Sequence, residues 1–394
     1  MPEQNISQDA RVTKMLEQML SDAIEKNASD IHMDPGRNHV SVRFRIDGVL
    51  YEVSKLPRDL YKPIASTMKV MSKLDITEHR TPQDGSFEVS NKMSTYNFRI
   101  STFPSVYGES IVLRILNKDS VIFDLREFGF DPEQFNLINK LIKSPFGIIL
   151  VTGPSGSGKT SLMYSVLNVL NKQSVNIITI EDPVEFLMDG TRQSQVSSDS
   201  EYTFARAMKS ILRQDPDVVM LGEIRDTESA QIAAQVSLTG RLVFSTIHTL
   251  NIRAAVARLL EMQVPPSVVA NALTGIVASR LVRKICPSCK QPYYPTDLEK
   301  TYLGNLVAAD QIYFKGMGCD KCMNSGYLGR TGIFEIVEID DELKKLIMTD
   351  SSLPNLQEIL KAKGVRSLGS SALAKVLAGE TTVEEAIRVV GSFN

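Results

Sequence analysis

The segment that most constrains this chain is Gly153–Thr160, which reads GPSGSGKT. It fits the pattern G-x-x-x-x-G-K-[ST], follows the apolar run Gly147–Thr152 and opens a stretch with helical periodicity. A strand, a glycine-rich loop and a helix in this order turn backbone N–H groups and a helix N-terminus toward phosphates. The residues expected to hold a nucleotide are Gly153, Pro154, Ser155, Gly156, Ser157, Gly158, Lys159 and Thr160. Lys159 is expected to reach the β- and γ-phosphates, and the Thr160 hydroxyl is expected to bind Mg²⁺.

Polar residues also follow three other apolar stretches. Val218–Leu221 leads to Glu223, which we expect at the end of a strand beside the phosphate-loop strand, where a carboxylate orients water around Mg²⁺. Ile178–Phe186 supplies Glu181, Asp182 and Glu185. Hydrolysis of ATP requires a carboxylate that positions or deprotonates water, for which Glu181 is the first choice and Glu185 the substitute. His248 follows the strand expected at 242–246 and is placed to sense the γ-phosphate, whereas a single histidine is more commonly structural.

The hydrophobic pattern changes along the chain and predicts several domains. Apolar residues recur at helical spacing between Val12 and Ile24, and alternating strands flank the hairpin signal Asp47-Gly48. After residue 131, short apolar strands alternate with helical stretches, as in an α/β domain with a largely parallel sheet. The predicted segments are an α+β domain (1–116), a linker (117–131), an α/β core (132–284), a cysteine-bearing subdomain (285–335) and a C-terminal helical subdomain (336–394).

The chain has four cysteines, and they form two CxxC pairs: Cys286 with Cys289, and Cys319 with Cys322. Two such pairs can complete a tetrahedron of sulfur ligands around Zn²⁺. Because four protein ligands leave no open position, the predicted zinc is structural, and its binding contributes about 10–16 kcal/mol to local folding. A redox-active dithiol is the alternative interpretation.

Composition and charge limit the class of protein. The formal net charge is −2, 43% of the residues are hydrophobic, and neither a secretory leader nor an apolar run long enough to span a bilayer is apparent. We therefore expect a cytoplasmic protein that contacts a membrane only through partners. The near-neutral charge provides no global field for nucleic acid.

Taken together, the motifs resemble those of the secretion and pilus-assembly ATPases of the type II secretion and type IV pilus class. Gly153–Thr160 is similar to that family's Walker A box, Ile178–Phe186 to its Asp box, Asp215–Asp226 to its Walker B box and Thr239–Leu250 to its His box. Further N-terminal segments are similar to the family as well: ASDIHMDP (28–35), RFRIDG (43–48), RTPQDG (80–85) and FPSVYGESIVLRIL (103–116).

The resemblance implies a PAS-like N-terminal α+β domain followed by a RecA-like ATPase domain with a tetracysteine zinc insert and C-terminal helices. It implies that Arg99 and Arg114 swing over the γ-phosphate, and that Arg213 and Arg225 make phosphate or intersubunit contacts. It also implies a homo-hexamer that uses ATP, Mg²⁺ and Zn²⁺ and drives a polytopic inner-membrane platform protein, with which it associates peripherally. The tetracysteine insert favours assembly over pilus retraction. The sequence is similar to a short form without the family's additional N-terminal docking domain.

Two other functions remain alternatives at this stage. RecA-like rings also move DNA, but the chain has no basic stripe interleaved with aromatic residues, so nucleic acid is not an expected partner. A scaffold that binds nucleotide without hydrolysing it would not need the acids at the predicted strand ends.

Overall fold

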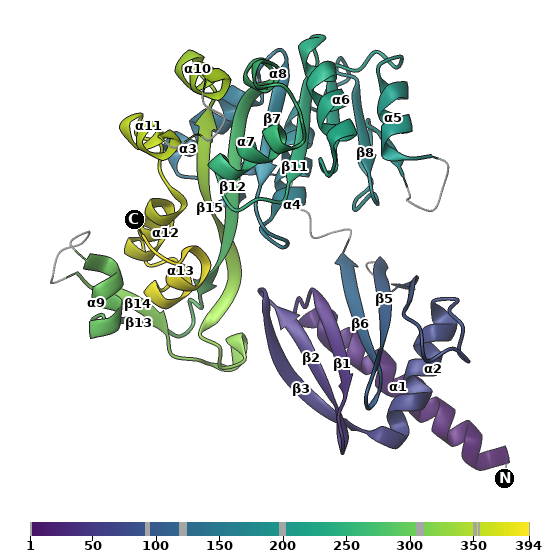
Figure 1. Ribbon diagram of the computed structural model, residues 1–394. Coiled ribbons are helices and arrows are strands. Elements are labelled where there is room, and N and C mark those ends of the chain that lie inside the picture. Colours follow the sequence, from purple (N-terminus) through teal and green to yellow (C-terminus); the bar gives the residue numbers. More distant parts are fainter. Residues whose placement is uncertain are drawn as a thin grey trace. The chain divides into compact units, whose positions relative to one another are not determined.

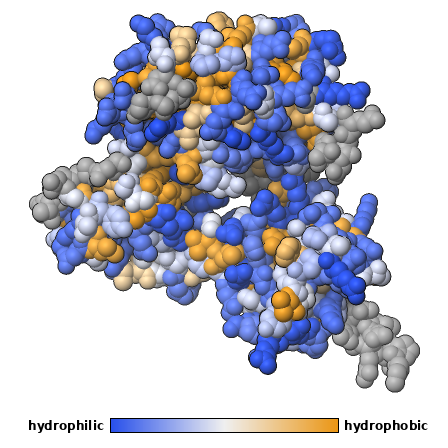
Figure 2. Space-filling view, viewed as in Figure 1, coloured by the Kyte–Doolittle hydropathy of each residue, from blue (hydrophilic) through white to orange (hydrophobic). Residues whose placement is uncertain are grey.

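The computed structural model describes residues 2–90, 95–117, 124–196, 202–304, 311–349, 353 and 355–393. The chain forms two compact units, Met1–Ser120 and Val121–Asn394 (Figure 1). Among the helices of the described ranges, none has the length and hydropathy needed to cross a bilayer. The face drawn in Figure 2 is mostly hydrophilic and is interrupted by small apolar patches.

In its described residues, the first unit is an antiparallel sheet with two helices. Its elements are α1 (Pro2–Glu25), β1 (Asp30–Pro35), β2 (His39–Ile46), β3 (Val49–Pro57), α2 (Arg58–Met71), β4 (Gln83–Ser90), β5 (Thr95–Ser105) and β6 (Gly108–Asn117). The strands pair in the order β3-β2-β1-β6-β5-β4. This arrangement confirms the predicted mixture of helices and hairpins without a parallel crossover.

The sequence pattern explains the local structure of this unit. Alternate residues of β2 are buried, as expected for a strand with one covered face. The turn from β2 to β3 places Asp47 at φ +49° and Gly48 at φ +84°, the left-handed backbone that a tight two-residue hairpin turn requires. In α1, the side chains of Val12, Leu16 and Leu20 are buried, in agreement with the helical spacing.

The second unit is built on a seven-stranded sheet. From the start of this unit to the central strands its elements are a 3₁₀ helix η1 (Leu125–Phe128), α3 (Pro132–Leu141), β7 (Gly147–Thr152), α4 (Lys159–Leu170), β8 (Ile177–Glu181), β9 (Arg192–Gln195), α5 (Phe204–Ile211), β10 (Val218–Leu221), α6 (Thr227–Leu238), β11 (Leu242–Ile247), α7 (Ile252–Glu261) and α8 (Pro266–Ala272). They are followed by β12 (Leu273–Ile285), β13 (Lys290–Tyr293), α9 (Asp297–Leu303), β14 (Tyr313–Gly316), a 3₁₀ helix η3 (Asp320–Cys322), β15 (Tyr327–Glu338), α10 (Asp341–Thr349), α11 (Leu356–Ala362), α12 (Leu368–Leu377) and α13 (Val383–Val390).

The order of the strands in this sheet is β15-β12-β7-β11-β10-β8-β9. All neighbouring pairs are parallel except β12 and β15, which are antiparallel. This confirms the largely parallel sheet. The expectation that the strand before Glu223 lies beside the phosphate-loop strand is wrong, because β11 is inserted between β7 and β10. Periodicity identifies strands but does not fix their order.

Both faces of the sheet are covered. Ile148, Leu150 and Val219 belong to the core under α5, α6, α7 and α8, whereas their sequence neighbours Ile149 and Met220 face α3 and α4. Central strands buried on both faces are continuous apolar runs, and each residue of β7, β10 and β11 is buried.

The predicted boundaries at 284/285 and 335/336 fall inside strands. β12 and β15 pair over most of their length, so the cysteine-bearing segment leaves the core sheet at one strand and returns at its neighbour (Figure 1). Within that segment, β13 and β14 form a separate two-stranded sheet. The predicted linker also contains η1, in which Leu125 and Phe128 are buried against the second unit.

Candidate active site and four-cysteine cluster

The phosphate loop connects β7 to α4 and depends on its glycines. A Cβ at Gly153 would lie 2.4 Å from Ser157 Oγ and 2.6 Å from the carbonyl oxygen of Ser279. Gly158, immediately before the first residue of α4, has φ +86°. The loop therefore requires small residues for close packing at one end and a left-handed backbone at the other.

Lys159 lies at the first position of α4 and is only 7% exposed. Its ammonium group donates to the carbonyl oxygens of Gly153 at 2.8 Å and Pro154 at 3.0 Å. Burial lowers the pKa of Lys159 to about 8, although the nearby Glu223 raises it. An anionic ligand at the loop would stabilise the charged ammonium group. Thr160 follows on the exposed side of the same turn.

The carboxyl ends of β7, β11, β10 and β8 meet at one edge of the sheet. The register aligns Thr152 with Ile247, and the hydroxyl of Thr152 bonds to Thr249 in the loop that carries His248. His248 Nε2 lies 3.2 Å from Glu223 Oε2. The structure therefore brings together two of the predicted site residues, Glu223 and His248.

Arg225 links a second acid, Asp182, to this pair. Its Nε donates to Glu223, and its NH1 lies 3.3 Å from Asp182 Oδ2. The Walker B and Asp-box segments are thus linked by one guanidinium group, in a region where Arg225 is 59% exposed.

The two candidate bases have different environments. Glu181 ends β8 and is 3% exposed. Oε2 accepts a hydrogen bond from Tyr164 at 2.5 Å and Oε1 accepts one from Thr179 at 2.6 Å, so both of its oxygens are occupied within the core. Burial raises the pKa of Glu181, and the bonds from Thr179, Tyr164 and Gln193 oppose that rise. Glu185 lies four residues later in the loop and is partly exposed.

Three functional candidates lacked a motif in the sequence. Tyr164 lies on α4, and Ser279 and Arg280 lie on β12, which is parallel to β7. Ser279 Oγ donates to the carbonyl oxygen of Ser157 in the phosphate loop at 3.1 Å. Arg280 donates to the carbonyl oxygen of Leu250 beyond His248. For Ser279 and Arg280, the only signal in the sequence was that two polar residues interrupt the apolar run 273–282.

In the first unit, Arg99 on β5 and Arg114 on β6 are directly opposite each other in the sheet. Arg114 Nε bonds to Asp30 at 3.0 Å and the side chain is 66% exposed. Like charges in opposing positions destabilise a pair of strands, and a bound anion would relieve that repulsion.

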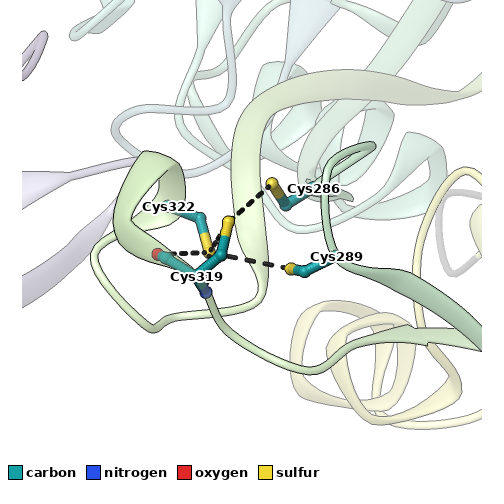
Figure 3. A group of neighbouring side chains, drawn as sticks. All are labelled: Cys286, Cys289, Cys319 and Cys322. Carbon is teal, nitrogen blue, oxygen red and sulfur yellow. Dashed lines mark hydrogen bonds between the residues drawn. The ribbon is translucent and has the colours of Figure 1, made fainter.

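The four cysteines converge from two loops (Figure 3). Their Sγ atoms all lie within 4.8 Å of one another, with 3.9 Å between Cys286 and Cys319, 3.8 Å between Cys289 and Cys322, and 3.7 Å between Cys319 and Cys322. A tetrahedron with Zn–S bonds of about 2.3 Å requires sulfur separations of about 3.8 Å. The cluster can hold a metal ion.

Backbone amides support a thiolate in this cluster. The N–H groups of Cys319 and Gly326 donate to Cys322 Sγ at 3.2 and 3.3 Å. Burial raises the pKa of Cys322, but these bonds outweigh it and lower the pKa to about 7. Metal ligation requires the deprotonated sulfur, which the environment of Cys322 favours, whereas burial raises the pKa of Cys289 to about 11.

Comparisons with known proteins find a matching family model and similar proteins. The family model described as "Type II/IV secretion system protein" matches residues 5–388. The chain is 44% identical to the type II secretion system ATPase E of Vibrio cholerae over 381 residues, which cover 97% of this chain and 76% of that protein. It is 43% identical to the type IV pilus assembly ATPase PilB of Myxococcus xanthus over 386 residues, 96% of this chain and 68% of that one.

The fold is also similar to a solved structure. The pilus retraction motor PilT with bound ADP superposes with a TM-score of 0.64 at 26% identity, and the alignment covers 94% of this chain and 95% of that one.

Proposed function

The chain belongs to the family of type II/IV secretion system proteins, and we propose that it is the ATP-hydrolysing motor that powers type II secretion or type IV pilus assembly. The observation that carries this function is the shared sheet edge at which Lys159, at the end of the phosphate loop, lies near enough to Glu223 of the Glu223–His248 pair to feel its charge. This edge provides a phosphate cradle and a carboxylate, which are the two parts that hydrolysis of ATP requires.

In the proposed reaction, water attacks the γ-phosphorus and the bond to the oxygen that bridges the β- and γ-phosphates breaks. The products are ADP and inorganic phosphate. The Thr160 hydroxyl would hold Mg²⁺ on the Glu223 side of the site, where the ion would neutralise charge on the phosphate oxygens. Lys159 binds the β- and γ-phosphates, and His248 contacts the γ-phosphate while its Nε2 lies against Glu223.

We assign the water-activating carboxylate to Glu185 rather than to Glu181. Glu181 is only 3% exposed, and its two oxygens accept hydrogen bonds from Tyr164 and Thr179 in the core, which keeps the carboxylate away from solvent. Of the other two acids of the Asp box, Asp182 is paired with Arg225, and Glu185 is partly exposed in the loop after β8, so we assign the proton to Glu185.

The two opposed arginines of the first unit fit the role of neutralising the transition state. Arg99 and Arg114 occupy one cross-strand pair, so both guanidinium groups can reach the same anion. Cationic groups of this kind contribute roughly 10³–10⁵-fold to phosphoryl-transfer rates. We propose that they close over the γ-phosphate.

We propose that the cysteine cluster binds a structural Zn²⁺ through Cys286, Cys289, Cys319 and Cys322. Three of the six sulfur separations are 3.7–3.9 Å and fit the tetrahedral geometry, and all of them are within 4.8 Å. Four protein ligands exclude a catalytic water from the metal, so the ion stabilises the excursion between β12 and β15.

Membership of this family supports a proposal for the assembly. We propose that the first unit is a PAS-like domain and that the chain forms a homo-hexamer, in which head-to-tail contacts close the ring. The ring acts at the cytoplasmic side of the inner membrane by driving a polytopic platform protein.

The test compares ATP turnover and ring formation of the Lys159→Ala and Glu223→Gln variants with those of the wild-type chain. Lys159→Ala is expected to lose nucleotide binding, whereas Glu223→Gln is expected to bind ATP and turn it over at least 100-fold more slowly, in the range seen when one charge-stabilising group is removed. Unchanged ATP turnover in both variants would contradict the proposed function.

A further inference from the structure

Tyr164 and Glu181 form a buried contact that no step of the reaction above uses. Tyr164 is 0% exposed and lies in the second turn of α4, one turn after Lys159 and Thr160. Its hydroxyl donates to Glu181 Oε2 at 2.5 Å. Burying a carboxylate and a phenol together is costly unless each finds its partner, so the pair is expected to hold its geometry firmly.

The same contact extends to the loop that carries Glu185. The backbone N–H of Phe186 points to the Tyr164 hydroxyl at 3.4 Å, and the rings of Tyr164 and Phe186 meet edge to face at 5.3 Å. On the other side, Gln193 of β9 donates from Nε2 to the Phe186 carbonyl oxygen at 2.8 Å. Gln193 Oε1 accepts from the N–H of Met188 at 2.7 Å.

Glu185 therefore lies in a segment that is fixed on both sides. Glu181 precedes it and is bonded to α4, and Phe186 follows it and contacts both Tyr164 and Gln193. The helix that fixes this segment is the one whose first turn contains Lys159 and Thr160. The phosphate-binding residues and the candidate base thus share one rigid support.

We propose that Tyr164 and Glu181 are positioning residues, which hold the loop carrying Glu185 at a fixed distance from the phosphate-binding turn of α4. This inference rests on the proposed function. Neither side chain touches substrate. Their contribution is to keep the base aligned with the attacking water, because a displacement of about 1 Å can cost about 100-fold in rate.

The first experiment compares steady-state turnover of Tyr164→Phe, Glu181→Gln and the double variant with that of the wild-type chain. Tyr164→Phe removes the donor and retains the ring that packs on Phe186. The loss of positioning is expected to lower kcat about 10-fold. KM for ATP is expected to change less than about twofold, because the phosphate loop itself is untouched. The double variant is expected to be no slower than the slower single variant, since both substitutions break one contact.

Tyr293→Phe is the matched control. The Tyr293 hydroxyl donates to Glu299 at 2.6 Å, a bond between the same two residue types, and Tyr293 lies in the separate sheet of β13 and β14. This variant is expected to lower Tm as Tyr164→Phe does but to retain wild-type kcat. A purely structural role for Tyr164 predicts the same kcat in both variants, which would overturn the inference.

Two further outcomes distinguish a failure of this inference from a failure of the proposed motor function. If Glu181→Gln is as inactive as Glu185→Gln while Tyr164→Phe is fully active, Glu181 is the base and the positioning role is wrong. If Tyr164→Phe retains wild-type kcat while Lys159→Ala is inactive, the motor function stands and the inference fails. If Tyr164→Phe does not fold, Gln193→Ala tests the inference instead. This variant removes the other hydrogen bond to Phe186, and the inference requires it to show the same fall in kcat at constant KM.

Discussion

The buried carboxylate of Glu385 connects the C-terminal helices to β12, and its neutralisation is expected to destabilise the second unit strongly. Glu385 is 0% exposed on α13. It accepts hydrogen bonds from the backbone N–H of Arg283 at 3.0 Å, from Arg283 NH2 at 2.7 Å and from Arg388 NH2 at 2.6 Å. Arg283 is itself only 13% exposed. Glu385→Gln preserves the shape but leaves a buried guanidinium group without its counter-charge.

Breaking one partner of a buried ion pair costs about 3–5 kcal/mol. For a domain of this size each kcal/mol lowers Tm by about 2–4 °C, so the expected fall is about 6–20 °C. The chain has no Trp, and unfolding is therefore best followed by far-UV circular dichroism in urea and on heating. Glu228→Gln is the control, because its bond to Lys209 at 2.8 Å joins two side chains that are more than half exposed. Exposed pairs contribute about 0–1 kcal/mol.

The dependence on pH provides a second check of the same prediction. Burial raises the pKa of Glu385, but the bonds from Arg388 and Arg283 outweigh it and hold the pKa below its usual value. A lowered folded-state pKa gives stability that is present above the unfolded value of about 4.3 and is lost as pH falls through the folded-state pKa. The difference in the free energy of unfolding between wild type and Glu385→Gln should therefore become smaller at acidic pH. A loss no larger than that of Glu228→Gln at pH 7 would refute the reasoning.

The remaining predictions concern the metal, the loop and the arginines. Metal analysis should find about one zinc per chain. Cys319→Ser should lose the zinc, and its 286–322 segment should become accessible to proteolysis. Full retention of zinc by Cys319→Ser would contradict the assignment. Gly153→Ala should weaken ATP binding at least about 10-fold, because the added Cβ would meet Ser157 and Ser279; unaltered binding in equilibrium titration contradicts the close packing. Arg99→Ala and Arg114→Ala should each lower kcat by at least about 100-fold, while Arg37→Ala, at an exposed position of the same unit, should not; equal activity of all three argues against a role over the γ-phosphate.

Local patterns predicted most of this molecule. The alternation in β2 and the glycines of the phosphate loop each determine a local backbone shape, and that shape is present in the structure. The resemblance to the secretion and pilus ATPases is confirmed by the family match over residues 5–388. These features depend on neighbouring residues in the sequence, where steric and periodic rules are strong.

Long-range pairing was not predictable in the same way. The insertion of β11 beside β7, and the addition of β12 and β15 to the core sheet, depend on how distant segments pack. The environment of Glu181 depends on Tyr164, which is 17 residues away and on a helix. An acid at a strand end can face solvent or the core, and the strand pattern alone does not distinguish the two orientations.

The most direct test of the central claim is a structure of the chain with Mg²⁺ and a non-hydrolysable ATP analogue. The predicted result is a γ-phosphate within hydrogen-bond distance of Lys159 Nζ, which has left the carbonyl oxygens of Gly153 and Pro154, with Glu223 and His248 at the same edge. A triphosphate bound elsewhere, with Lys159 still on those two carbonyl groups, would contradict it.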